Sequence, residues 1–171
     1  MEFPEVVQRK HRTLVLALGS AIMGDDGAGR AALELLRTGY ALPDTVDLVD
    51  GGVLGLGLLD ALDGYPRVLV LDCVTAGEPP GTVVRLDGEA VPAAFTRPIS
   101  PHQTGLSDVL ATLGLLGRAP EHLTVIGVEP GRIELGLELS DPVQAALPRM
   151  ARAAADVLTE WGLRVRPRRT G

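Results

Sequence analysis

Residues 12–29 read RTLVLALGSAIMGDDGAG, and this stretch decides the fold that the rest of the chain is expected to follow. Its first seven residues form an apolar run that ends at Gly19, a pattern typical of a strand buried on both faces of a parallel sheet. From Asp26 to Leu36, small and apolar residues recur at helical spacing, with acidic residues at the start and Arg37 at the end. A buried strand that passes through a glycine-rich turn into a helix predicts an α/β unit.

Apolar runs of strand length alternate with helical patterns along the rest of the chain. Further strands are predicted at residues 45–49, 67–71, 81–86 and 122–128, and further helices at residues 54–62, 105–116 and 141–160. This order predicts an α/β fold: a single domain with a doubly wound, mostly parallel five-stranded sheet and helices on both faces. We expect the domain to span residues 1–171, with an ordered core over about residues 12–161 and a basic tail, residues 162–171.

Three local features add detail to this prediction. Only residues 76–80 separate the third strand from the fourth, which is too few for a parallel crossover, so residues 81–86 are expected to form an antiparallel edge strand. Asp141 is expected to cap the last helix, and Pro148 to kink or break it. The arginines within residues 164–169 are expected to lie in a frayed, solvated C-terminus.

Composition narrows the class of protein. Hydrophobic residues make up 46% of the 171 residues and aromatic residues only 3%, so we expect one core built from aliphatic side chains. The net charge of −6 argues against a non-specific nucleic-acid binder, which needs clustered lysine and arginine. No apolar stretch approaches the roughly 20 residues that cross a bilayer, and residues 1–12 lack the apolar segment of a secretory signal. We therefore expect a monomeric cytoplasmic protein that binds neither nucleic acid nor membrane.

Aspartates follow three of the predicted parallel strands. Asp25 and Asp26 lie in the loop after the first strand, Asp50 follows the second, and Asp72 follows the third. In open α/β sheets, ligands bind beyond the carboxyl ends of the strands, and the first and third strands are commonly neighbours across a topological switch point. Asp26 and Asp72 are therefore expected to face each other across this crevice.

Each of these acids also has a purely structural interpretation. A carboxylate at a helix N-terminus caps the chain and complements the helix dipole, and Asp72 is able to cap the turn after its strand. We favour capping for Asp25 and a functional role for Asp26, because the glycines around Asp26 leave the crevice open. Asp50 either caps the short helix or lines the crevice. Two carboxylates at a helix start repel phosphate, so residues 19–29 do not form a dinucleotide-binding fingerprint.

Three histidines are candidates for a further ligand. His11 precedes the first strand and is expected to be solvated, and His122 begins the fifth strand at the opposite end of the sheet from the crevice. His102 lies in ISPHQTG, where we expect an irregular loop. Two carboxylates and an imidazole suit Ni²⁺, Zn²⁺, Mn²⁺ or Fe²⁺ and leave coordination positions for water or substrate. The prediction is one metal-capable catalytic site formed by Asp26, Asp72 and His102.

At this point the chain resembles a known family, the hydrogenase maturation endopeptidases. The resemblance is carried by LALGSAIMGDDGAG near the start, VDGG near residue 50, VLVLDCV around Asp72, ISPHQTGLSDVL around His102, and HLTVIGVEP. It covers nearly the whole chain except the tail. In that family, the residues at the positions of Asp26, Asp72 and His102 bind a metal. One departure is Ser20, which stands where the family usually has asparagine.

The resemblance implies an endopeptidase that removes a C-terminal extension from the precursor of a [NiFe]-hydrogenase large subunit. The cut lies beside the last Cys-x-x-Cys-x-x-His/Arg motif of that subunit, and nickel already inserted in the precursor serves as the recognition element. Nickel (Ni) then arrives with the substrate, although another divalent cation is able to occupy the site in isolation. The implied enzyme is a nickel-dependent hydrolase of aspartyl or metallo type, with Asp26, Asp72 and His102 at the metal.

Two other functions remain open from the residues alone. One is a metal-dependent hydrolase of a small molecule on the same sheet, which predicts a deep and enclosed pocket. The other is a chaperone that binds nickel or the large subunit without cutting it. The chain lacks the H-E-x-x-H and G-x-S-x-G motifs. Cys73 is its only cysteine, and no histidine is predicted to lie where it could activate the thiol. Zincin, serine and cysteine mechanisms therefore have little support.

Overall fold

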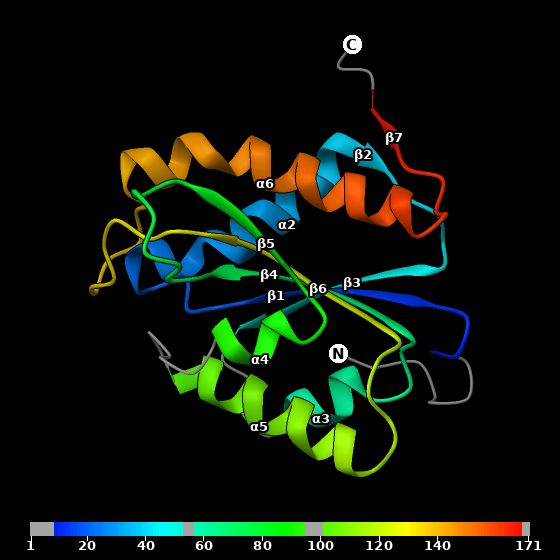
Figure 1. Cartoon of the computed structure of the whole chain (residues 1–171). Helices are drawn as coiled ribbons and strands as arrows, with labels where there is room; N and C mark the ends of the chain where they lie inside the picture. Colours follow the sequence, from blue (N-terminus) through cyan, green and yellow to red (C-terminus); the bar gives the residue numbers. More distant parts are fainter. Residues whose placement is uncertain (1–8, 53–56, 95–100, 169–171) are drawn as a thin grey trace.

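A central sheet with helices on both faces organises the molecule (Figure 1). The computed structural model describes residues 9–52, 57–94 and 101–168, except for the side chains of residues 93–94 and 101–104. The five strands of the sheet lie in the order β3 (Val46–Gly52), β1 (Thr13–Leu18), β4 (Arg67–Cys73), β6 (His122–Val128) and β5 (Val83–Asp87). A second sheet pairs β2 (Tyr40–Ala41) with β7 (Arg166–Pro167). The helices are the 3₁₀ turn η1 (Gly24–Gly27), α2 (Ala28–Gly39), α3 (Gly57–Leu62), α4 (Ala90–Ala94), α5 (Pro101–Leu115) and α6 (Asp141–Glu160).

The strand order confirms the predicted doubly wound α/β fold. Strands β3, β1, β4 and β6 are parallel, and β5 pairs with β6 in the antiparallel direction at the sheet edge, as the short link before it predicted. The chain leaves β1 for β3 on one side and returns to β4 on the other. The topological switch point therefore lies between the carboxyl ends of β1 and β4, where functional groups are expected in this class of sheet.

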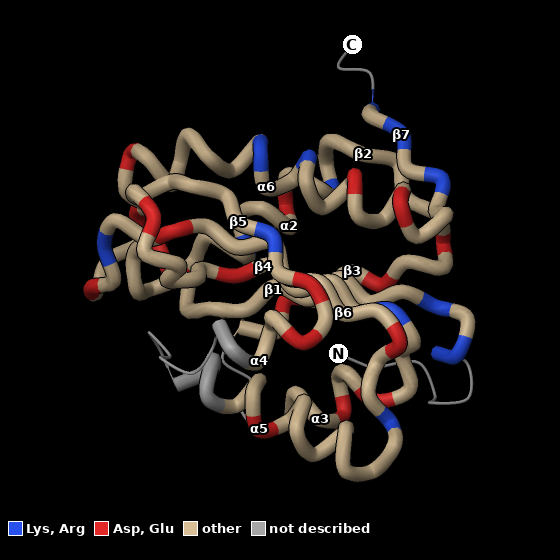
Figure 2. Tube along the Cα trace, in the orientation of Figure 1, with Lys and Arg blue, Asp and Glu red and all other residues tan. Residues whose placement is uncertain are grey.

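The core is divided by the sheet into two aliphatic layers. All six residues of β1 are buried, and they alternate between the two layers as the pleat of a strand requires. Val15 and Ala17 pack with α2 and α6, whereas Leu14, Leu16 and Leu18 pack on the side of α3 and α5. Figure 2 shows few charged residues along the central strands. No helix in the described part of the chain is long and apolar enough to cross a membrane.

The C-terminal part of the chain differs from the predictions in two places. The prediction of a frayed tail is wrong up to Arg168. The backbone N–H of Arg168 donates to Gly39 O (2.7 Å), and its guanidinium donates to Tyr40 O (3.0 Å), at the end of α2. These bonds satisfy carbonyl groups that a helix end leaves open. Of the two effects predicted for Pro148, the early break is wrong, because α6 continues to Glu160, the predicted end of the helix, and the kink stays a prediction.

The segment between β5 and β6 is more helical than predicted. Residues 90–94 form the short helix α4 where irregular chain was expected. Helix α5 begins at Pro101, so the irregular loop predicted around His102 is wrong: His102 lies in the first turn of a helix. Proline is favoured in a first helical turn, where its missing N–H costs no hydrogen bond.

Helix α2 packs unusually close to the ends of two strands at Gly29. A Cβ atom at Gly29 would collide with the backbone oxygen of Leu71 and would lie 2.7 Å from that of Leu18. Leu18 is the last residue of β1, and Leu71 lies two residues before the end of β4, so this glycine lets the helix start directly on the switch point.

We predict that Gly29→Ala lowers the free energy of unfolding by about 3 kcal/mol, because backbone atoms of two strands must move to admit the methyl group. Gly39→Ala, at the other end of the same helix, is the matched control, since a Cβ there meets nothing within 4 Å. That control should leave the free energy unchanged or raise it by up to about 1 kcal/mol. Urea unfolding of the two variants measures both values, and equal stabilities would contradict the close packing.

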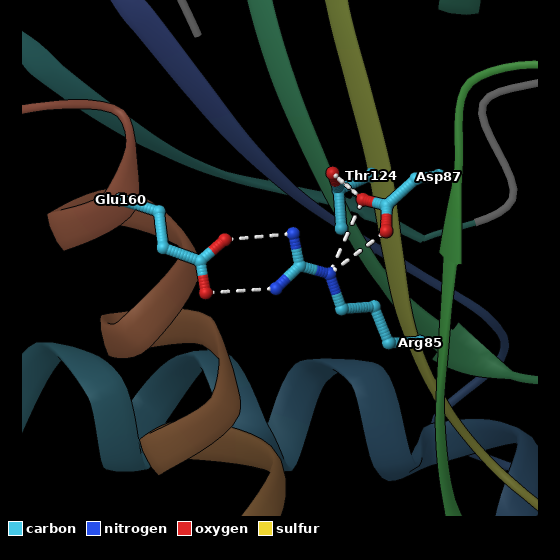
Figure 3. A network of polar contacts seen from close by, with 4 residues as sticks. All are labelled: Arg85, Asp87, Thr124 and Glu160. Carbon is cyan, nitrogen blue, oxygen red and sulfur yellow. Dashed lines mark hydrogen bonds and ion pairs between the residues drawn. The ribbon is translucent and has the colours of Figure 1, made fainter.

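The edge strand β5 is tied to its surroundings by a polar network at the end of the sheet away from the switch point (Figure 3). Arg85 Nε donates to Asp87 (2.9 Å), and its terminal nitrogens contact the Glu160 carboxylate (2.8 and 2.9 Å) on α6. Thr124 Oγ1 donates to Asp87 (2.6 Å). Burial raises the pKa of Asp87, but the bonds from Thr124 and Arg85 outweigh it and hold the pKa below its ordinary value. The bond from Arg85 also lowers the pKa of Glu160.

We predict that Arg85→Met lowers the melting temperature at pH 7 by about 1–3 °C, because exposed ion pairs contribute little. A carboxylate with a lowered folded-state pKa contributes stability above its unfolded pKa of about 4, and this contribution is lost as the pH falls. The difference between wild type and Arg85→Met should therefore shrink toward zero at pH 3. Calorimetry at both pH values tests this, and a difference that stays constant would contradict the role of the network.

Candidate functional site

Asp26 sits in the turn η1, directly between β1 and α2. The turn depends on Gly19, whose φ of 104° favours glycine and whose missing side chain leaves room for the backbone of Asp26. The Ser20 N–H donates to Asp26 Oδ2 (2.8 Å), and the residue is only 1% exposed. The carboxylate is therefore fixed by its own loop. The bond comes from the backbone of residue 20, so serine supplies it as well as asparagine does.

Asp72 is the last residue but one of β4 and lies next to the switch point. It is fully buried, and its Oδ1 accepts a hydrogen bond from the Cys73 N–H (2.7 Å). The turn η1 packs against β4, so the structure brings the loop of Asp26 and the strand of Asp72 together at one end of the sheet. The sequence predicted that these two acids lie at the carboxyl ends of neighbouring strands. The structure confirms this, because β1 pairs with β4 and η1 packs against β4.

The pKa of the Cys73 thiol reflects the negative charge around Asp26 and Asp72. Burial raises the pKa of Cys73, and the negative charges of Asp72, Asp25 and Asp26 raise it further. The thiol is therefore neutral at physiological pH and a poor nucleophile. The absence of support for a cysteine mechanism in the sequence agrees with this environment.

The position of His102 is defined only by its backbone. It lies in the first turn of α5, which begins at the same end of the molecule as the carboxyl ends of the parallel strands (Figure 1). Its side chain falls outside the described part of the structure. Among the side chains that are described, no group of three His, Cys, Asp or Glu residues is placed to hold a metal ion. The three-residue site therefore stays a prediction, with its two carboxylates placed at one edge of the sheet.

The other titratable candidates lie in different environments. Asp50 accepts a hydrogen bond from the Gly52 N–H (3.1 Å) and forms an ion pair with Arg30 Nε (3.1 Å), so it links β3 to α2. His122 begins β6 at the far end of the sheet, and His11 is exposed, both as predicted.

Asp25 has a role that the sequence did not reveal. The predicted capping of α2 is wrong: the fully buried carboxylate points to a segment more than 100 residues away. It accepts four hydrogen bonds, from Gly131 N (2.8 Å), Arg132 N (2.7 Å), Ser140 N (2.6 Å) and Ser140 Oγ (2.7 Å). The N-cap of α6 is Ser140 and not the predicted Asp141, which is the first residue of the helix, and the Ser140 hydroxyl bonds Asp25 instead of the helix backbone. Asp25 therefore clamps residues 131–140 to the turn that carries Asp26.

A second buried carboxylate organises the loop after β4. Glu129 is 6% exposed, and its Oε2 accepts hydrogen bonds from Ala76 N (2.7 Å) and Glu78 N (3.3 Å). This acid was also absent from the predicted site. The loops that follow β1, β4 and β6 are thus joined by buried carboxylates that accept hydrogen bonds from backbone N–H groups.

Open grooves surround this end of the molecule. One of about 660 Å³ lies between η1, α2 and residues 137–144, and a smaller one of about 250 Å³ lies between Gly24 and residues 132–138. Neither Asp26 nor Asp72 lines them. The described grooves are open to solvent, unlike the deep and enclosed pocket expected for a small-molecule hydrolase.

The fold and the site define an α/β protein with two buried aspartates at the switch point of its sheet. Comparison with known proteins gives the family. The family model described as hydrogenase maturation protease matches residues 31–157. The chain is 37% identical over 158 residues to the hydrogenase 2 maturation protease of Escherichia coli K12, covering 92% of this chain and 96% of the relative. It is 38% identical over 158 residues to the hydrogenase expression/formation protein HupD of Bradyrhizobium diazoefficiens, covering 91% and 82%.

A solved structure leads to the same family. The hydrogenase maturating endopeptidase HybD from E. coli superposes with a TM-score of 0.87 at 37% identity, covering 92% of this chain and 98% of that one. The chain belongs to the hydrogenase maturation protease family. It is therefore a protease, as the motifs around Asp26, Asp72 and His102 implied.

We predict that Asp25→Asn lowers the free energy of unfolding by about 3 kcal/mol, because an amide offers one acceptor oxygen where four bonds now reach a carboxylate. Hydrogen exchange should accelerate most at the amides of Gly131, Arg132 and Ser140. Asp156→Asn, an exposed position on α6, is the control and should change the free energy by less than about 0.5 kcal/mol. Unchanged exchange at those three amides would show that the clamp is not needed.

Proposed function

We propose that this protease removes a C-terminal extension from the nickel-loaded precursor of a [NiFe]-hydrogenase large subunit. The observation that carries the proposal is the pair of buried aspartates, Asp26 and Asp72, at the switch point of a hydrogenase maturation protease fold. The names of the relatives, which refer to hydrogenase maturation and to an endopeptidase, support the substrate. In this proposal the enzyme acts in the cytoplasm as a monomer.

Nickel enters the proposed reaction as part of the substrate. Carboxylate oxygens and an imidazole nitrogen are suitable ligands for Ni²⁺, and Asp26, Asp72 and His102 are the residues proposed to engage it. Because both carboxylates are buried and bonded to backbone N–H groups, they keep their positions without a resident metal. A site of this kind distinguishes a precursor that contains nickel from one that does not.

The proposed cleavage is hydrolysis of one peptide bond. A water molecule next to the carboxylates attacks the carbonyl carbon, and its proton passes to one carboxylate of the pair. The amide nitrogen takes up this proton as the C–N bond breaks, which returns the carboxylate to its charged form. Nickel held in the precursor supplies positive charge beside the reacting carbonyl.

The two alternatives have less support. A hydrolase of small molecules predicts an enclosed pocket, whereas the grooves next to η1 are open. A chaperone without catalysis conflicts with membership of a protease family.

We expect the variants Asp26→Asn, Asp72→Asn and His102→Ala to fold and to lower the rate of precursor cleavage by about 10²–10⁴-fold, the usual contribution of an acid–base group. The assay follows the mass of the nickel-loaded precursor, and a nickel-free precursor should stay uncut. Asp87→Asn, at the opposite end of the sheet, is the control and should cleave normally. Normal cleavage by the Asp26 or Asp72 variant would remove these residues from the site, and no cleavage by the wild-type enzyme would refute the function.

A further inference from the structure

Three aliphatic side chains stand in solvent beside the turn that carries Asp26. Ile22 is 55% exposed, Leu135 79% and Leu137 78%, and we call these three residues the aliphatic rim. We propose that the aliphatic rim is the docking surface for an apolar segment of the large-subunit precursor next to its scissile bond. The inference rests on the proposed function and names the surface through which the substrate binds.

The rim is held together by backbone bonds between distant segments. The Gly136 N–H donates to Ile22 O (2.9 Å), and the Gly24 N–H donates to Gly136 O (2.9 Å). A β-bridge between Met23 and Gly136 joins the same two segments. Ile22 therefore lies beside the stretch that carries Leu135 and Leu137, although more than 100 residues separate them.

The backbone of the aliphatic rim is also held in place by the buried carboxylate of Asp25. Asp25, three residues after Ile22, accepts hydrogen bonds from both ends of residues 131–140, the segment that carries the two leucines. An exposed apolar surface on a clamped backbone loses little conformational freedom when a partner covers it, which favours binding. Exposed aliphatic groups held in this way are typical of interaction sites.

The position of the rim indicates which partner covers it. Ile22 lies in the loop that leads into η1, four residues before Asp26, whose carboxylate accepts a hydrogen bond from Ser20 N. When a peptide bond of the precursor reaches Asp26, residues of the precursor a few positions away along its chain are therefore able to contact the aliphatic rim. The groove of about 250 Å³ between Gly24 and residues 132–138 is lined by Leu135 and Leu137, and its size suits a side chain and not a whole domain.

The charges beside the groove indicate which charge the docking segment of the precursor carries. Glu134 and Glu138 line it together with Arg132, and Arg132 Nε is paired with Glu134 (3.4 Å). Two acids against one base leave this surface negative. Figure 2 shows the charged residues of the segment between β6 and α6 at this end of the molecule. The segment that docks here is therefore expected to carry a basic residue next to its apolar side chains.

The chain offers a matched control for the rim. Leu115 and Leu116, at the end of α5, are 91% and 56% exposed. Helix α5 begins at the end of the sheet that carries the switch point and runs away from it, so these leucines lie at the opposite end of the molecule (Figure 1). They have the same chemistry and comparable exposure, and they lie away from Asp26 and Asp72.

The test compares Leu135→Ser/Leu137→Ser with Leu115→Ser/Leu116→Ser in cleavage of the nickel-loaded precursor. We expect the rim variant to raise KM at least tenfold with kcat within twofold of wild type, because the residues bind substrate without touching the reacting atoms. The control should leave both constants within twofold. Melting temperatures of both variants verify the fold. An unchanged KM for the rim variant, or an equal rise for the control, overturns the proposal.

The acidic part is tested by Glu138→Lys against Glu121→Lys, an exposed position at the far end of the sheet. We expect only Glu138→Lys to raise KM, and more so at low salt than at high salt. Direct binding of the precursor separates this inference from the proposed function. If wild type leaves the precursor uncut but binds it more tightly than the rim variant does, the function fails and the docking surface stands. If wild type cuts and the rim variant binds equally well, the docking surface fails alone.

Discussion

The buried carboxylate of Asp25 is the constraint on which the functional end of the molecule depends. A fully buried charge is costly unless hydrogen bonds replace its hydration, and here four donors do so. The donors come from the start and end of residues 131–140, so one side chain fixes both ends of the segment that leads into α6. Because Asp26 follows directly, the same bonds that hold the distant segment also hold the turn that carries Asp26.

Two adjacent aspartates thus have separate tasks, and their surroundings decide which task each takes. Asp25 is surrounded by N–H groups of another segment, whereas Asp26 accepts a bond from Ser20, within its own loop. Gly29 adds the second constraint, because its close approach to β1 and β4 sets the helix start on the switch point. The position of Asp26 relative to Asp72 therefore follows from this packing.

The parts of the fold that depend on local patterns were predictable. Buried apolar runs predicted the five strands of the central sheet, and the short link before β5 predicted its direction. The alternation of strands and helices predicted the switch point, because the first and third strands of such folds are commonly neighbours. Errors arose where distant partners decide the outcome: the clamp of Asp25 reaches residues 131–140, and Arg168 pairs with the end of α2. The helical start at Pro101 was missed because a proline suits both a loop and a first helical turn.

The site itself explains why substrate selection has to extend beyond the two acids. Asp26 and Asp72 are buried and line neither of the open grooves next to the turn, so a folded partner contacts mainly the surface around them. Two carboxylates select a cation, but they carry no information on the sequence of the protein that delivers it. In our proposal the aliphatic rim, which lies on a clamped loop, supplies that information at small entropic cost. In the proposed function, recognition of the metal and recognition of the precursor are separate tasks of one clamped loop, and Asp25 supports both.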